Sequence, residues 1–177
     1  ETLILQLLHY KNILIFLIFS MLLGMASQTS NIWTGVFLHS FDGIAQYKDA
    51  FAVKYPGIIV SIATIFETGF ILIIPFFLRN YGIKVIMLIS ILAWGLRFGL
   101  LAFGNPGDGF IFILLSMLFY GCAFDFFNLS GSIYMNTVAE ARIRASAQGL
   151  FFTMVNGFGF IFGGRLSGML VDYYTQS

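Results

Sequence analysis

The chain has 177 residues, of which 59% are hydrophobic, 18% aromatic and only 10% charged, and its net charge is +1. A soluble domain carries about 25% charged residues, so this composition, with 22 phenylalanines, excludes a soluble protein and indicates an integral membrane protein. The near-neutral charge excludes the basic footprint of a nucleic-acid-binding protein.

Cysteine and the first residues add two further expectations. The single cysteine, Cys122, excludes a disulfide framework and a cysteine-rich metal site, and no cofactor motif is present, so we expect neither a metal nor a cofactor. The sequence does not begin with methionine, and its first residues lack the pattern of a signal peptide. We therefore expect a piece of a longer protein.

Five apolar segments are each long enough to cross a bilayer, which takes about 20 residues in a helix. Polar or turn-forming stretches separate them, including a tight basic turn at 79–84 and a glycine-rich turn at 104–109. The sequence therefore predicts an all-α integral membrane bundle with five transmembrane helices. Their expected ranges within 1–177 are 12–38, 57–78, 83–103, 110–135 and 146–171.

The basic residues are distributed unequally between the two sides of such a bundle. One side holds the N-terminus and the second and fourth loops, and the other holds the first and third loops and the C-terminus. By the positive-inside rule, the N-terminus is expected in the cytoplasm and the C-terminus outside. The first side carries Lys11, Arg79, Lys84, Arg142 and Arg144, and the second carries Lys48 and Lys54.

The first and second spans each carry a polar face. Gln28 and Asn31 share one face of the first span, where their carboxamides can donate and accept hydrogen bonds to sugar hydroxyls or base edges. The alternative is that they only bridge helices in lipid. The second span carries Thr64 and, one turn later, Glu67, which lies near the middle of the membrane.

The third span contains a single arginine, Arg97, six residues before its outer end. A long basic side chain so placed is expected to reach the outer interface. An ion pair with Asp108 or with an acid on another helix is the second expectation.

The fourth span carries the second acid, Asp125, at helical spacing from Gly121, so that the two share one face. A carboxylate inside a membrane costs at least ~2.5 kcal/mol on insertion scales, so such an acid indicates a functional site. The alternative is that Asp125 only pairs with a buried cation or a backbone group. By residue count, Asp125 and Glu67 lie within about one helical turn of the same depth.

The fifth span is rich in glycine. Gly159 with Gly163, and Gly164 with Gly168, form two pairs at the spacing that lets membrane helices approach closely. Polar groups near the midplane of several helices, beside such packing faces, are typical of a secondary transporter.

Two other classes of membrane protein are the alternatives. An intramembrane enzyme would need an acid dyad, a Ser/His or Ser/Lys pair or a metal cluster within the spans. The sequence predicts none of these, because the two acids fall on spans that are not consecutive and the spans hold no cluster of histidine or cysteine. A purely structural subunit would not need two buried acids. The sequence therefore favours a transporter and not an enzyme.

Several stretches resemble the C-terminal half of a bacterial nucleoside–proton symporter of the major facilitator superfamily. The resemblance covers nearly the whole chain, and its strongest parts are 120–132 and 143–149, with 16–24, 37–42 and 74–84 in support. It implies a twelve-span protein of the bacterial inner membrane, of which the chain would be spans seven to eleven. Its partners would be nucleosides, protons, membrane lipid and the N-terminal half of the same protein. A porter for another small polar solute, such as a sugar, is the alternative.

The resemblance also implies which residues form the site. The solute would be bound by Gln28, Asn31, Thr64, Glu67, Tyr120 and Phe124. The family pattern has a glutamine where this chain has Thr64; a hydroxyl is shorter and has fewer donors, so the base or sugar preference stays open. Asp125 is expected to carry the coupled proton, and Glu67, which suits hydrogen bonding to the solute, is the second candidate for coupling.

Overall fold

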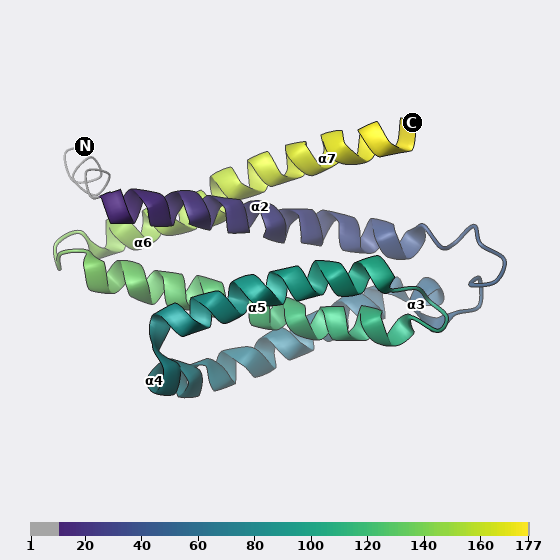
Figure 1. Ribbon diagram of the computed structural model, residues 1–177, viewed down its shortest axis with the longest axis horizontal. Coiled ribbons are helices and arrows are strands. Elements are labelled where there is room, and N and C mark those ends of the chain that lie inside the picture. Colours follow the sequence, from purple (N-terminus) through teal and green to yellow (C-terminus); the bar gives the residue numbers. More distant parts are fainter. Residues whose placement is uncertain (1–10, 177) are drawn as a thin grey trace. The chain divides into compact units, whose positions relative to one another are not determined.

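The computed structural model describes residues 11–176, and every regular element among them is helical. By length and composition, α2, α4, α5 and the continuous helix Arg144–Thr175 can each cross a membrane. The predicted all-α membrane fold is therefore confirmed. In chain order the elements are α2 (Lys11–His39), α3 (Phe51–Lys54), α4 (Pro56–Phe103), α5 (Phe110–Val138), α6 (Arg144–Phe152), the π-helix η1 (Thr153–Gly159) and α7 (Phe160–Gln176) (Figure 1).

The long element α4 contains two spans. Its helix is interrupted at Gly82, whose φ of 77° and ψ of 167° lie in a region open almost only to glycine. The ribbon reverses direction close to the α4 label in Figure 1. We therefore treat α4 as a first segment, 56–81, and a second segment, 83–103, which brings the number of spanning helices to five. The interruption falls in the predicted basic turn.

The chain forms two compact units. The terminal unit consists of the described residues up to Ile32 and from Gly131 onward, and the central unit is Trp33–Ser130. Helices α2 and α5 contribute residues to both.

Within the terminal unit, α2 packs closely against η1 and α7 because glycines remove the side chains from the contact. A Cβ atom added at Gly159 would lie 2.8 Å from the carbonyl oxygen of Met21, and one added at Gly163 would lie 2.6 Å from the Cα of Met25. Gly24 of α2 faces the backbone of Val155 in the same way. The first predicted glycine pair thus forms a helix–helix contact. The second does not, since a Cβ at Gly168 would meet no atom of the described chain within 4 Å.

This contact gives a matched pair of variants. We expect Gly163→Ala to destabilise the complete protein by about 1–3 kcal/mol, because its methyl group would press on the backbone of α2. Gly168→Ala adds the same methyl group to open space and should leave stability unchanged or slightly improved. Thermal unfolding in detergent measures both. Equal unfolding midpoints for the two variants would contradict the close contact between Gly163 and α2.

The central unit has its own apolar core, which joins the end of α2 to α3, α4 and α5. The short helix α3 lies in the stretch 41–56, which the sequence predicts only as a loop. It forms because Ala52 and Val53 are buried, so the loop is folded onto the bundle. The buried cluster comprises Leu38, Ala52, Ile59, Ala63, Ile113 and Met117.

The predicted turn at 104–109 is held by one side chain. Asn105 Oδ1 accepts hydrogen bonds from the backbone N–H groups of Gly107 (2.9 Å) and Gly109 (3.1 Å). These bonds satisfy backbone donors at the start of α5.

Candidate functional site

The predicted site residues are divided between the two units. Gln28 and Asn31 belong to the terminal unit, and the other predicted residues belong to the central unit. Thr64 and Glu67 lie on α4, and Tyr120, Phe124 and Asp125 lie on α5, so we describe these two helices of the central unit first.

A backbone contact joins the two acid-bearing helices of the central unit. A Cβ atom added at Gly121 of α5 would lie 2.7 Å from the backbone nitrogen of Glu67 and 2.9 Å from its Cα. Spans that are not consecutive in the sequence therefore touch at Glu67. This differs from the expectation that the acids are separated by lying on non-consecutive spans.

Aromatic contacts continue this packing along both helices. Phe126 of α5 is 1% exposed and packs edge to face on Phe70 (5.7 Å between ring centroids) and at a tilt on Phe77 (5.5 Å). Since Glu67 meets Gly121 and Phe70 meets Phe126 further along both helices, the first segment of α4 and α5 run in the same direction. Asp125, one turn after Gly121, therefore lies about 6 Å along the axis from the level of Glu67.

Asp125 is buried without a partner for one of its oxygens. Its side chain is 7% exposed, and Oδ2 makes no hydrogen bond to any described residue. Buried polar atoms almost always have a partner, and leaving one without costs about 1–3 kcal/mol. A proton on Asp125 would remove the charge of this buried group, and a donor group of a bound solute would give Oδ2 a partner.

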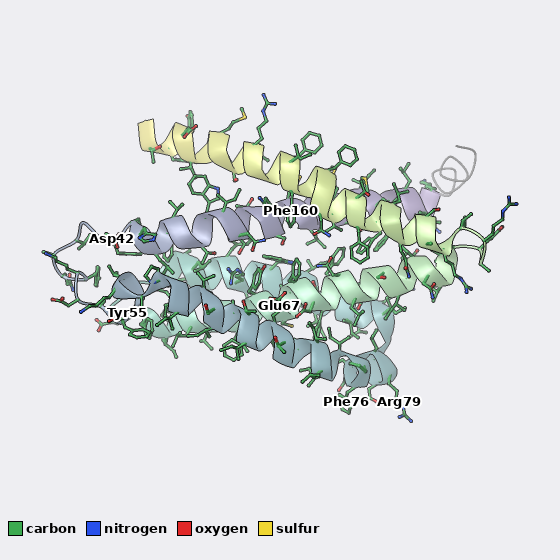
Figure 2. All side chains as sticks on the ribbon, turned by 180° about the vertical axis from the view of Figure 1, so that it is seen from behind. Asp42, Tyr55, Glu67, Phe76, Arg79 and Phe160 are labelled. Atoms are coloured by element: carbon green, nitrogen blue, oxygen red, sulfur yellow. The ribbon has the colours of Figure 1, made fainter. Side chains whose placement is uncertain are left out.

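Glu67 lies about midway along the first segment of α4, as Figure 2 shows between Tyr55 at one end and Arg79 at the other. Its side chain is half-buried, whereas Thr64, one turn earlier, is exposed. The hydroxyl of Thr68 donates to the backbone carbonyl of Thr64 (2.9 Å). Because Thr64 and Glu67 are three residues apart in one helix, their hydroxyl and carboxylate lie along one side of this segment.

Two aromatic rings on α5 form a stack that ends at the residue directly before Asp125. The rings of Tyr120 and Phe124 are nearly parallel, with 10° between their planes and 5.8 Å between centroids, and both are half-buried. Trp94 of α4 packs edge to face on Tyr120 at 5.9 Å. The pair offers flat apolar surface suited to a planar ring.

Arg97 does not reach the outer interface, so that prediction is wrong. It is 2% exposed and donates hydrogen bonds to the carbonyl oxygen of Ser116 (2.7 Å) and to Oγ1 of Thr34 (3.0 Å). Its guanidinium lies over the ring of Tyr120. The sequence pointed to Arg97 but not to its buried contacts, although Trp94 one turn before it indicates a face turned to protein.

Both carboxamides of the terminal unit lie on α2, and Gln28 lies beside α7. The Cγ of Gln28 is 4.0 Å from the Cβ position at Gly164, and Gln28 is half-buried whereas Asn31 is exposed. That they share one solute with the acids of the central unit stays a prediction.

Comparison with known proteins identifies related sequences. A family model described as "Nucleoside H+ symporter" matches residues 2–177. Xanthosine permease of Escherichia coli (strain K12) is 54% identical over 91% of this chain and 39% of its own length. Nucleoside permease NupG of the same organism is 54% identical over 94% of this chain and 40% of its own length.

Solved structures agree with the sequence comparison. The crystal structure of an aspartate-to-alanine mutant of nucleoside transporter NupG matches with a TM-score of 0.94 at 52% identity, over 98% of this chain and 43% of that one. A second NupG crystal structure matches with a TM-score of 0.91 over 96% of this chain and 42% of that one. The chain thus spans about two fifths of the length of the relatives that it matches.

Proposed function

Because the chain belongs to the nucleoside H+ symporter family, we propose that it is part of a transporter that imports nucleosides together with protons by alternating access. This is a family of multi-pass membrane transporters and not of enzymes. The proposal places the chain in the C-terminal half of a twelve-span major facilitator protein of the bacterial inner membrane. An N-terminal half would then complete the solute pathway.

One observation carries the proposal beyond the family. Two acids on helices in direct contact lie within about one turn of each other in depth, and the deeper-buried one, Asp125, has an oxygen without a partner. Ionisable groups inside membrane spans mark proton and solute paths, because their cost is otherwise unexplained.

We assign the roles as follows. The Tyr120–Phe124 stack receives the base or the ribose face, and Glu67 and Thr64 hydrogen-bond the hydroxyls or ring nitrogens. Asp125 carries the proton, with Glu67 as the second candidate. Gln28 and Asn31 contribute donor and acceptor groups from α2.

A sugar porter is the remaining alternative, because a hydroxyl at Thr64 and a carboxylate at Glu67 suit sugar hydroxyls as well. Uptake of radiolabelled uridine by the complete protein, with competition by other nucleosides and by free ribose, separates the two. Competition by nucleosides alone is the expected result. Competition by ribose or glucose at similar concentrations would establish the sugar porter instead.

Gln28→Ala and Asn31→Ala should each raise the apparent KM for uridine about tenfold in the complete protein. Removing one partner of a buried polar contact typically costs about 1–3 kcal/mol. Thr29→Ala is the matched control, since the Thr29 hydroxyl already donates to the Met25 carbonyl within the helix (2.9 Å). An unchanged KM in both carboxamide variants, with normal protein in the membrane, would remove these residues from the site.

A further inference from the structure

Arg97 is a buried cation held by two neighbouring helices. Its NH1 donates to the carbonyl oxygen of Ser116 on α5 at 2.7 Å, and its NH2 donates to Oγ1 of Thr34 on α2 at 3.0 Å. A guanidinium is planar, and two hydrogen bonds from different nitrogens fix the orientation of that plane. Ser116 and Thr34 are themselves buried, so both hydrogen bonds are shielded from solvent.

The fixed guanidinium holds an aromatic ring. The Cζ of Arg97 is 4.6 Å from the centroid of the Tyr120 ring, within the range of a cation–π interaction. Trp94 lies one turn before Arg97 on the same helix and packs edge to face on the same ring. One face of the second segment of α4 therefore fixes Tyr120 from two positions.

Tyr120 in turn stacks on Phe124, and each ring keeps part of its surface exposed. Whatever fixes the plane of Tyr120 also limits the plane of Phe124, because the two rings are nearly parallel. Arg97 itself is 2% exposed and so presents almost no surface to a solute.

We propose that Arg97 is a positioning residue that holds the Tyr120–Phe124 stack in the orientation that receives the flat ring of the solute. The inference rests on the proposed function and adds to it a residue that acts through Tyr120 without touching the solute. It predicts an effect on affinity with little effect on the coupling of transport to protons.

The test measures uridine exchange and uridine accumulation by the complete protein in proteoliposomes. Arg97→Met should raise the KM of exchange without a proton gradient about threefold to tenfold, as expected for losing a desolvated cation–π contact. At saturating uridine, the accumulation ratio under an imposed proton gradient should stay within about twofold. Arg165→Met is the matched control, since Arg165 is an exposed arginine of α7.

Two further variants test whether Arg97 acts on the solute site through Tyr120 or only stabilises the packing of the helices. In a Tyr120→Leu background, Arg97→Met should raise KM less than about twofold further, because residues that act through one contact are not additive. Thr34→Val leaves Arg97 in place, removes one anchor and should raise KM in the same direction by a smaller factor. Thr34→Val also keeps the test decisive if Arg97→Met does not reach the membrane.

The outcomes distinguish the two proposals. Wild-type uptake of uridine combined with an unchanged KM in Arg97→Met, or in Thr34→Val if Arg97→Met is not produced, would overturn the role of Arg97 alone. An equal rise of KM with and without Tyr120 would also overturn it. No nucleoside uptake by the wild-type protein would overturn the proposed function, and the role of Arg97 with it.

Discussion

Asp125→Asn in the complete protein is expected to abolish accumulation of uridine driven by a proton gradient while leaving uridine binding within about threefold. The substitution keeps the shape of the side chain and removes the group that binds and releases a proton. The buried Oδ2 atom without a partner is where that proton would be held. Uptake against a concentration gradient in proteoliposomes, paired with a binding measurement in detergent, gives both quantities.

Two further variants test the assignment of Asp125. Asp172→Asn removes an exposed carboxylate of α7 and should accumulate uridine like the wild type. If Asp125→Asn still concentrates uridine and Glu67→Gln does not, then the two acids have exchanged roles. If both variants concentrate it, then neither acid carries the proton and the mechanism is wrong.

Gly121→Ala is expected to lower transport at least about tenfold, although alanine is the better helix former. The new methyl group would lie 2.7 Å from the backbone nitrogen of Glu67, so α5 and the first segment of α4 would have to separate. Overpacking of this kind typically costs about 1–3 kcal/mol and shifts the backbone. The shift would move the two acids apart, and uridine uptake per molecule of inserted protein measures the loss.

Gly99→Ala is the matched control for this variant. Gly99 lies in the second segment of α4, and an added Cβ would meet no atom of the described chain within 4 Å. Wild-type uptake in Gly99→Ala and reduced uptake in Gly121→Ala are expected together. Wild-type uptake in both would show that the close approach at Gly121 is not needed for transport.

The membrane-spanning helices could be predicted from the sequence because a bilayer leaves the backbone few choices. Long apolar segments must satisfy their N–H and C=O groups internally, so length and hydropathy suffice to find them. The reversal at Gly82 was also predictable, since its residues combine turn-forming and basic types. Helix α3 was not, because four residues of an otherwise polar loop become helical only when Ala52 is buried against the core.

The depth of the two acids in the membrane could be predicted from the sequence, but the contacts between their helices could not. Counting residues places Glu67 and Asp125 at similar levels, and the contact at Gly121 supports this. Which helices touch depends on packing between segments that are distant in sequence. For the same reason, the sequence favours the membrane interface for the long side chain of Arg97, with an ion pair to another acid as the second expectation. The contact of its guanidinium with the ring of Tyr120, on another helix, shows that the side chain lies in the protein interior.

The most direct test of the central claim is to follow proton movement with a pH-sensitive dye inside proteoliposomes of the complete protein while uridine is added outside. No proton gradient is imposed, and labelled uridine is counted in the same preparation. We predict that the lumen becomes acidic as uridine is taken up, that ribose gives no signal, and that Asp125→Asn gives none with either. Uptake of labelled uridine by the wild-type protein without acidification of the lumen would contradict proton-coupled import.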